Sequence, residues 1–353
     1  MNIRALPRPL ARVRREARRT SGWGGLLYAV PALALLVLFE LWPVFFNLWI
    51  SLWKWDVAPL SFVGLANYRR LFLDGFITRD YTGSLAVGEV LHSLIVTAYY
   101  VLWTVPVTIF LAFGLAALLF RQVVGRGALR TIYFLPHITS GAAIAVVFAW
   151  MFSAQAGVVN ALLRAIGLPT QRWLEDPIPF LKRITQAAGL GTLPGLPDLL
   201  AGPSTALVVI IIYSIWSSLG FNIVVYLAGL TAIPTDLYEA ARIDGAGRWT
   251  ILRRITWPLL MPTTFFLLIY NTIGAFQAFT PIYILTRGSG LGRGEAGGPI
   301  DSTLTITVYL FRNFYERANS VGYAAAVAFL LFFIMLGLTV VQFRVVGRRV
   351  QYQ

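Results

Sequence analysis

The chain has 353 residues, of which 58% are apolar and only 12% are charged, and it contains no cysteine. Soluble domains carry roughly twice this share of charged residues, so the composition argues against a soluble domain and predicts a membrane protein. The lack of cysteine excludes disulfides and cysteine-ligated metal sites. The formal net charge is +14; we attribute it to membrane topology and anionic headgroups rather than to nucleic-acid binding.

Six apolar segments lie between the formal charges, and each is long enough to cross a membrane, which takes about 20 residues. Their expected cores are residues 26–53, 91–120, 131–152, 206–230, 263–285 and 324–342. The sequence therefore predicts an all-α integral membrane protein with six transmembrane helices.

A basic tail, residues 1–25, opens the chain and carries seven arginines. Signal peptides also begin with positive charge, but their apolar region has only about 7 to 15 residues, whereas the apolar run here continues to Ile50. We therefore predict an uncleaved first transmembrane helix at 26–53. Glu40 is an ionisable residue inside this span, and because Pro43 follows it, we favour a structural or polar-contact role near a bend.

Residues 54–89 form an external segment of balanced charge that contains the sequence FVGLANYRRLF. Residues 90–345 are expected to form the core of the protein, with five transmembrane helices, and residues 346–353 are a second tail. Within the core, residues 157–168 suit a short helix lying in the membrane interface. We interpret residues 178–203 as an external insertion. It either contributes to the recognition of an external partner or packs as a flap, and the sequence leaves both possibilities open.

A polar and basic stretch, residues 233–262, separates the fourth and fifth spans and is far too charged to sit in lipid. Its sequence, IPTDLYEAARIDGAGRWTILRRITWPLLMP, predicts a helix that starts near Thr235, with Pro234 as the first helical residue. Gly245 is expected to end this helix, and a second helix follows over residues 248–257. The stretch is therefore predicted to be a helix-turn-helix at a membrane surface.

Lysine and arginine placement predicts the orientation, because basic loops stay in the cytoplasm. The first tail, the turn at residues 121–130, the 233–262 stretch and the C-terminal end from Arg344 together hold 17 basic and 4 acidic residues, whereas the segments on the opposite side hold 12 and 10. We therefore expect both termini and the 233–262 stretch to be cytoplasmic.

The 233–262 stretch resembles the cytoplasmic coupling loop, or EAA motif, of permease subunits in binding-protein-dependent ABC importers. Glu239, Ala240, Ala241 and Gly245 match its defining positions, and the pattern IPxxLYEAAxIDGA is similar to the carbohydrate-uptake branch, the maltose and glycerol-phosphate type. The sequences FVGLANYRRLF, TIYFLP and RWLEDP also resemble this family. The resemblance implies a type I ABC importer permease fold in the inner or plasma membrane of a prokaryote.

The same resemblance implies the partners. They are a second homologous permease subunit, two ABC ATPase subunits that bind ATP and magnesium, an external solute-binding protein, and membrane lipids; no nucleic acid is expected. The chain itself contains no GxxxxGK[ST] phosphate loop, so we expect it to bind no cofactor and not to be an enzyme. Its two histidines, His92 and His137, are too few for a histidine-ligated zinc site, and we interpret them as packing residues.

The conformational change that ATP hydrolysis drives in the ATPase subunits is expected to reach this chain through the EAA-like stretch. Small alanines permit close approach of a partner, Glu239 and Arg242 can form interfacial ion pairs, and Gly245 supplies the turn. The residues expected to couple to the ATPase are Leu237, Tyr238, Glu239, Ala240, Ala241, Arg242, Asp244 and Gly245. The alternative is an amphipathic connector resting on headgroups, for which the acidic residues are poorly suited beside an anionic leaflet.

Polar and aromatic residues within the fourth and fifth spans are candidates for the substrate path, since hydroxyl-rich ligands need hydrogen bonds and flat apolar faces. The candidates are Asn222, Tyr226, Asn271, Phe276 and Gln277, with Asn222 the strongest. Alternatively, such residues bridge neighbouring helices or pack.

The predicted function is a permease subunit that forms half of the path for a sugar or oligosaccharide. The alternative within the family is import of glycerol phosphate or a related polyol phosphate, which would favour fixed basic residues in the path. Neither path span contains one. An ion-coupled secondary transporter is less favoured because no intramembrane charge pair is present, and a membrane-embedded enzyme is less favoured still.

Overall fold

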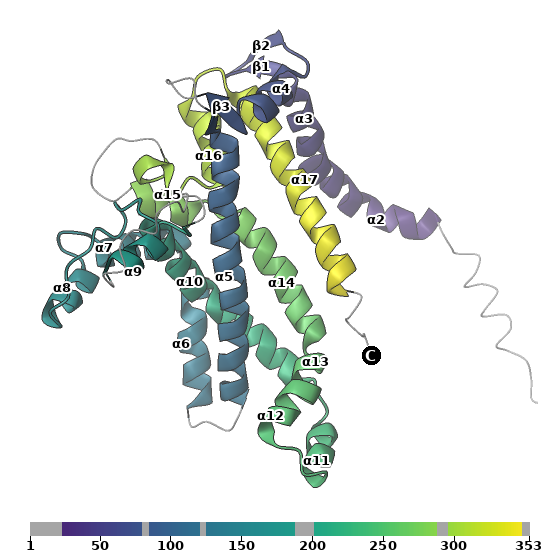
Figure 1. The fold of residues 1–353 in the computed structure, drawn as a ribbon. Coiled ribbons are helices and arrows are strands. Elements are labelled where there is room, and N and C mark those ends of the chain that lie inside the picture. The colour runs from purple at the N-terminus through teal and green to yellow at the C-terminus, as the bar shows by residue number, and fades with distance from the viewer. Residues whose placement is uncertain (1–22, 80–84, 121–124, 188–200, 288–295, 348–353) are drawn as a thin grey trace, which may run out of the picture.

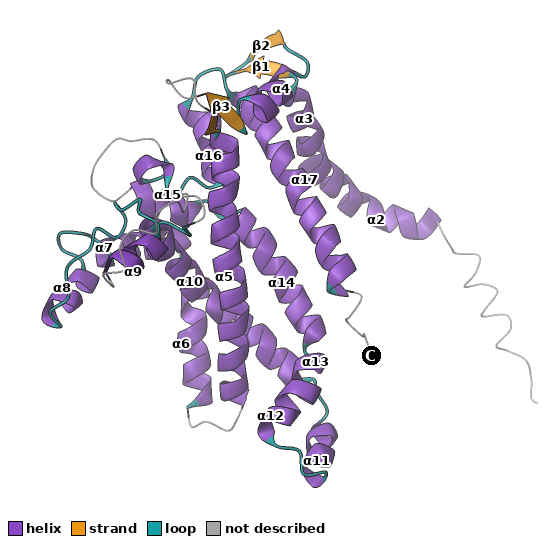
Figure 2. Cartoon of the chain, in the orientation of Figure 1, coloured by secondary structure: helices purple, strands orange, loops and turns teal. Residues whose placement is uncertain are grey.

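The computed structural model describes residues 23–79, 85–120, 125–187, 201–287 and 296–347. Most of both predicted tails lies outside these ranges. The described chain is largely helical, as Figure 1 and Figure 2 show. Its strands form two small antiparallel pairs, β1 (Trp53–Trp55) with β2 (Pro59–Phe62), and β3 (Ile77–Arg79) with β4 (Leu85–Val87).

Four helical stretches of the described chain are long and apolar enough to cross a membrane. They are Tyr28–Ser51, Glu89–Phe120, Thr205–Thr231 and Val321–Val345. The first comprises α2 (Trp23–Leu36), a π-helical turn (Val37–Leu41) and α3 (Trp42–Ser51), and the others are α5, α10 and α17. Each contains most or all of a span core predicted from the sequence. Two further pairs of helices qualify only if each bent pair counts as one crossing.

The third predicted span, residues 131–152, is not one continuous helix. α6 (Arg126–Ile138) ends with Thr139 in an extended conformation, and α7 (Gly141–Met151) begins two residues later. The axes of the two helices differ by 95°. The sequence contains helix-terminating signals here: Pro136 near the end of α6 and the Ser140–Gly141 pair at the start of α7. The prediction missed the break because the hydrophobic pattern continues across these residues.

The fifth predicted span, residues 263–285, is also interrupted. α14 (Met261–Phe276) stops before Gln277, and α15 (Thr280–Arg287) starts anew with Pro281 near its beginning. On its other side, α14 meets the helical stretch Arg248–Leu259 at an angle of 62°. That stretch comprises α12 (Arg248–Ile251), a π-helical turn (Leu252–Thr256) and α13 (Trp257–Leu259).

The core of the bundle is the packing of α10 against α5 and α6, together with that of α5 against α14. Small residues allow these helices to approach closely: Ala112 and Ala116 of α5 are completely buried. A Cβ atom on Gly220 of α10 would lie 2.0 Å from the carbonyl oxygen of Tyr133 in α6. Close backbone approach through small residues is the usual way in which membrane helices gain packing contacts.

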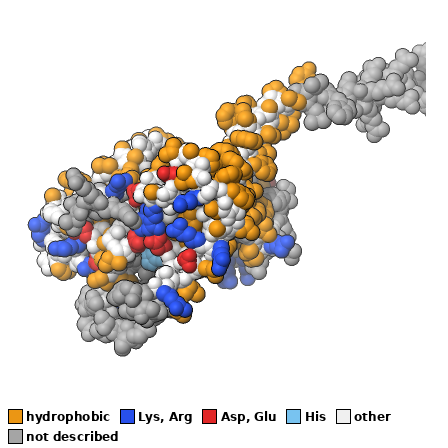
Figure 3. All heavy atoms as spheres, turned by 90° about the horizontal axis from the view of Figure 1, so that it is seen from above, with side chains coloured by type: hydrophobic (Ala, Val, Ile, Leu, Met, Phe, Trp, Pro, Cys, Tyr) orange, Lys and Arg blue, Asp and Glu red, His pale blue; other side chains and the backbone are white. Residues whose placement is uncertain are grey.

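Two ends of the bundle carry the connections (Figure 1). One end bears the hairpins, α4 (Ala66–Leu73) and α16 (Ile306–Phe311), while the opposite end bears α11 (Thr235–Ile243), α12, the end of α5 and the start of α6. Figure 3 looks onto the hairpin end, where acidic and basic side chains intermingle, and hydrophobic side chains cover the projecting first helix. The 233–262 stretch therefore lies across the bundle from the strands.

The predicted insertion, residues 178–203, contains a short helix, α9 (Phe180–Ala187), and its residues 188–200 lie outside the described ranges. The two described ends of the insertion are tied together. The amide of Phe180 donates to the carbonyl of Pro203 at 2.9 Å, and the amide of Thr205 donates to the carbonyl of Ile178 at 3.1 Å. The predicted interfacial helix at 157–168 is present as α8 (Val158–Ala165).

Candidate functional site

The turn after α11 is closed by backbone hydrogen bonds that require glycine. The Gly245 amide donates to the carbonyl of Arg242 at 3.1 Å, and the Ala246 amide donates to the carbonyl of Ala241 at 2.9 Å. This pair of bonds is the Schellman arrangement, in which the residue after the helix adopts a left-handed conformation. Gly245 has a φ of +76°, as that arrangement demands. Pro234 precedes the helix in an extended conformation instead of forming its first residue, a correction of one position.

The helix α11 lies on the surface of the described chain, with none of its residues fully buried. Of the eight predicted coupling residues, Leu237, Glu239, Ala240, Arg242, Asp244 and Gly245 are exposed, whereas Tyr238 and Ala241 are half-buried. The sequence analysis missed two apolar neighbours, Ile243 and Trp249, which are 86% and 71% exposed. The sequence signal that could have identified them is that each is a large apolar residue within an otherwise polar stretch. Exposed apolar residues rimmed by charge are typical of surfaces that contact another protein or a membrane.

A short chain of contacts connects this surface to the bundle. The hydroxyl of Tyr238 lies 3.4 Å from that of Thr256, which is buried. The next residue, Trp257, packs edge-on against Phe113 of α5 with ring centroids 5.0 Å apart. Packed side chains thus connect α11 to α5.

A cavity of about 530 Å³ lies among α5, α6, α10 and α14. Hydroxyl, amide, imidazole and aromatic groups line it together with small apolar residues. The polar side chains in its wall are Tyr100, Thr104, His137, Tyr213, Ser214, Ser217, Ser218, Tyr270, Asn271 and Gln277. No Asp, Glu, Lys or Arg belongs to this lining among the described residues. The central cavity therefore suits a ligand that carries hydroxyl groups and no net charge.

Aromatic rings form one wall of the central cavity. His137 stacks on Phe221 with ring centroids 5.1 Å apart, and Phe221 lies 4.8 Å from Tyr270. Several hydroxyls around the cavity are already paired: Tyr100 donates to Ser214 at 2.8 Å. Gln277, in contrast, is exposed, and its side chain makes no hydrogen bond within the described chain.

The five candidate path residues separate into three groups. Asn271 and Gln277 line the central cavity, although they are six positions apart, because the chain leaves the helix at Gln277. Asn222 is completely buried and Tyr226 donates to the hydroxyl of Thr264 at 3.1 Å, so neither reaches the cavity in this conformation. Phe276 lines a separate apolar groove between α5, α14 and α17.

The contribution of α5 to the central cavity was missed by the sequence analysis. Tyr100 and Thr104 lie in the middle of the second predicted span and are four residues apart, so they occupy one face of the helix. That spacing was the available signal. Without knowledge of which face looks inward, it could not be distinguished from ordinary packing.

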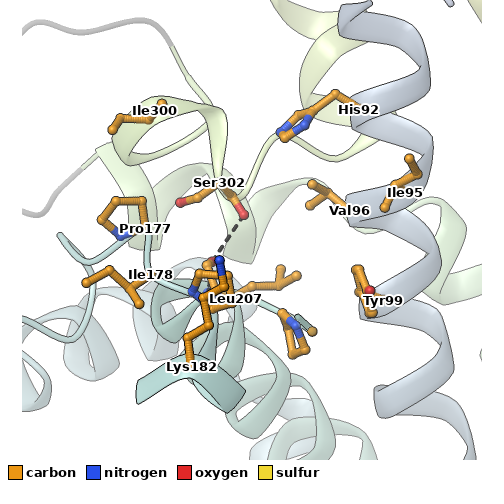
Figure 4. Close-up of a pocket in the computed structure, with 14 residues that line it drawn as sticks. His92, Ile95, Val96, Tyr99, Pro177, Ile178, Lys182, Leu207, Ile300 and Ser302 are labelled. Carbon is orange, nitrogen blue, oxygen red and sulfur yellow. Dashed lines mark hydrogen bonds between the residues drawn. The ribbon is translucent and has the colours of Figure 1, made fainter. Parts of the chain in front are cut away.

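A second cavity of about 530 Å³ lies toward the hairpin end, between α5, α9 and the loop before α16. Figure 4 shows His92 and Tyr99 of α5 on one side of it and Ile178 and Lys182 on the other. The Nε2 atom of His92 lies 3.0 Å from the carbonyl oxygen of Asp301. His92 thus has a backbone partner here, while His137 stacks at the central cavity.

Comparison with known proteins identifies the family. The model for binding-protein-dependent transport system inner membrane components matches residues 22–351. The chain belongs to this family. The permease is 32% identical over 331 residues to the lactose transport system permease protein LacF of Rhizobium radiobacter, an alignment that covers 94% of this chain and 96% of that protein.

Two further relatives extend the comparison. The sn-glycerol-3-phosphate transport system permease protein UgpA of Agrobacterium fabrum is 32% identical over 329 residues, covering 92% of the permease and 95% of UgpA. A chain in the crystal structure of a bacterial alginate ABC transporter in complex with alginate pentasaccharide-bound periplasmic protein has a TM-score of 0.71 at 21% identity. That alignment covers 96% of the permease and 99% of the other chain. The fold is therefore shared almost from end to end.

Family membership confirms four of the sequence predictions. The permease is a multi-pass protein of the inner membrane, it works in a binding-protein-dependent ABC importer, and it is not itself an enzyme. It binds no cofactor, because ATP is hydrolysed by partner ATPase subunits. Imported solutes in this group include sugars and sn-glycerol 3-phosphate, according to the names of the relatives.

Proposed function

We propose that the permease forms half of the translocation path for a neutral sugar or oligosaccharide. The observation that carries this proposal is the central cavity of about 530 Å³, whose lining combines hydroxyl, amide and aromatic side chains without an acidic or basic residue among the described ones. Sugar rings offer hydroxyls to polar groups and flat C–H faces to aromatic rings. The row of His137, Phe221 and Tyr270 supplies such aromatic faces.

The remainder of the path belongs to a second, homologous permease chain. Together with two ATPase subunits and an external solute-binding protein, the two chains make up the importer. In the permease, six spans place both termini and the 233–262 stretch in the cytoplasm, as the excess of basic residues there indicates. The hairpins and the insertion then face the binding protein. This assignment is supported by the position of α11 and α12 at the end of the bundle opposite the strands (Figure 1).

Coupling follows from the exposed surface of α11. ATP-driven closure of the ATPase subunits draws residues 235–256 inward, and contacts such as Trp257 on Phe113 carry the movement into the bundle. The central cavity is thereby switched between inward-facing and outward-facing access, as a rearrangement of packed helices between two states.

A glycerol phosphate or related polyol phosphate is the second candidate, because UgpA is as similar to the permease as LacF is. A phosphate group requires cationic side chains or helix N-termini around it. The lining of the central cavity has neither Lys nor Arg among the described residues, so an anionic solute would depend on the second permease chain for its counter-charge.

Uptake by the complete importer, reconstituted in proteoliposomes with its solute-binding protein outside, tests the choice of substrate. We expect ATP-dependent accumulation of radiolabelled lactose, maltose or trehalose and none of sn-glycerol 3-phosphate. Accumulation of the phosphate ester alone would contradict the neutral-sugar proposal and favour the second candidate.

Copurification with the ATPase subunits tests the coupling surface. Glu239→Gln removes one exposed charge of α11, and Arg172→Gln, in the segment predicted to be external, serves as a matched control. We expect the first variant to lower ATPase recovery and uptake and the second to leave recovery unchanged. Full ATPase recovery and uptake in both variants would show that Glu239 does not couple.

A further inference from the structure

The hydroxyl of Thr104 stands out among the groups in the wall of the central cavity. Thr104 is 93% buried in the middle of α5, with 7% of its surface exposed, and its Oγ1 atom has no hydrogen-bond partner among the described residues. A buried hydroxyl without a partner destabilises the folded state, since its interaction with water has been lost and nothing replaces it.

Three other buried threonines on the helices of this permease have the backbone partner that Thr104 lacks. Thr97 donates to the carbonyl of Ser93 at 2.7 Å, and Thr272 donates to the carbonyl of Leu268 at 2.6 Å. Thr286 likewise donates to the carbonyl four residues earlier, at 2.7 Å. Thr104 could likewise donate to the carbonyl four residues earlier in α5, but its side chain does not form this hydrogen bond.

The neighbours of Thr104 in the cavity wall give it no alternative partner. Tyr100, one turn away on the same face of α5, directs its hydroxyl to Ser214. Ser214 in turn donates to the carbonyl of Ile210 at 2.8 Å. The amide of Gln277, which also lines the cavity, is likewise without a partner in the described chain.

We propose that Thr104 is a specificity-determining residue whose hydroxyl forms a hydrogen bond with a hydroxyl group of the neutral solute in the central cavity. The inference rests on the proposed function and adds α5 to the helices that contact the solute. Threonine populates two χ1 rotamers on a helix, so a rotation about χ1 can turn its hydroxyl toward the cavity without moving the backbone. In the solute-bound state the hydroxyl faces the cavity, which Gln277 also lines.

Thr108 provides a matched control. It lies one turn further along α5, it is almost completely buried, and its Oγ1 atom also has no partner among the described residues. It does not belong to the lining of the central cavity. Replacing either threonine by valine, which has nearly the same shape, therefore removes an unsatisfied hydroxyl, but only Thr104→Val removes one beside the solute.

The test compares Thr104→Val, Thr104→Ser and Thr108→Val in the reconstituted importer, with uptake of lactose, maltose and trehalose as probes and thermal unfolding of the purified complex as the second readout. We expect Thr104→Val to raise the KM for uptake by about three- to tenfold, the effect of one lost neutral hydrogen bond. Thr104→Ser, which keeps the hydroxyl, and Thr108→Val should keep the KM of the parent. Both valine variants should unfold at or above the temperature of the parent.

Each remaining outcome overturns the inference in a recognisable way. Equal KM values for the two valine variants would remove Thr104 from the solute site while leaving the proposed function intact. A lower unfolding temperature for Thr104→Val than for Thr108→Val would indicate that the Thr104 hydroxyl is structural. If the parent importer takes up none of the three sugars, the neutral-sugar function itself fails, and this inference fails with it.

Discussion

Asn222 of α10 and Asn271 of α14 exchange hydrogen bonds through their side-chain amides. The Nδ2 atom of Asn271 donates to Oδ1 of Asn222 at 2.7 Å, and the reverse bond measures 3.3 Å. The second amide hydrogen of each is also in use, since Asn222 donates to the carbonyl of Ser218 and Asn271 to that of Leu267. The pair therefore joins two helices of the central cavity and has no donor left for a solute in this conformation.

Breaking this pair should destabilise the permease in a non-additive way. Asn222→Ala leaves Asn271 with an unsatisfied amide, and Asn271→Ala does the same to Asn222, so each single variant should lose about 1 to 3 kcal/mol. The double variant should lose little more than either single one, because the interaction is already gone. Thermal unfolding of the purified importer measures all three. Additive losses would mean that the two amides are stabilised independently.

The contrast between Asn222 and Gln277 shows what the sequence could reveal about the path. Polar residues in an apolar span identify which helices matter, and α10 and α14 do line the central cavity. The side on which each residue lies depends on where a helix ends and how it packs. Asn222 is buried between helices because Asn271 lies opposite it, and Gln277 reaches the cavity because α14 stops there. Neither fact is local to the sequence around the residue.

Regular helices and the 233–262 stretch were predictable for the opposite reason, since their signals are local. An uninterrupted apolar run of the right length predicts α10, and the left-handed glycine Gly245 after α11 is a common helix-ending signal. The break at Thr139 was not predicted, because Pro136 and Ser140 compete with a hydrophobic pattern that continues across them.

Gly245→Ala should weaken coupling through backbone strain alone. A residue with a side chain pays about 1 to 2 kcal/mol to adopt the left-handed conformation that Gly245 has at φ +76°. A Cβ atom there would meet nothing within 4 Å, so no steric clash contributes. We expect lower ATPase recovery on copurification and a reduced uptake rate, because the strain weakens the backbone hydrogen bonds that close the turn after α11.

Gly247→Ala is the matched control for that variant. Gly247 lies two residues further along the same turn, and an added Cβ atom would also meet nothing within 4 Å, but its φ of −69° suits any residue. ATPase recovery and uptake should match those of the parent. Equal defects in the two variants would attribute the effect to the loss of flexible glycines and not to the left-handed conformation.

Gly220→Ala should disrupt the contact between α10 and α6. The added Cβ atom would lie 2.0 Å from the carbonyl oxygen of Tyr133, which belongs to the backbone and cannot rotate away. Overpacking of this kind costs about 1 to 3 kcal/mol. Gly114→Ala, on an open face of α5, should instead leave the unfolding temperature unchanged or raise it slightly, since alanine favours the helix by about 0.5 to 1 kcal/mol. A similar loss in both variants would contradict close packing at Gly220.

Two arginines at the hairpin end differ in burial and should therefore differ in their contribution to stability. Arg312 is only 2% exposed, and its guanidinium contacts Asp301 at 2.6 Å and donates from Nε to the carbonyl of Ala296 at 3.0 Å. Arg317 forms a two-point contact with Glu89, at 2.6 and 2.8 Å, in a more exposed position. Low dielectric and lost hydration make the first contact far more costly to break than the second.

Arg312→Gln should consequently lower stability much more than Arg317→Gln. Removing one partner of a buried ion pair costs about 3 to 5 kcal/mol, and we expect the low end of this range because the side chain of Asp301 is 38% exposed. The exposed pair should contribute no more than about 1 kcal/mol, and added salt should reduce that contribution further. Unfolding temperatures of both variants at low and high salt measure the difference. Equal, salt-sensitive losses would indicate that the Arg312 pair is hydrated like the surface pair.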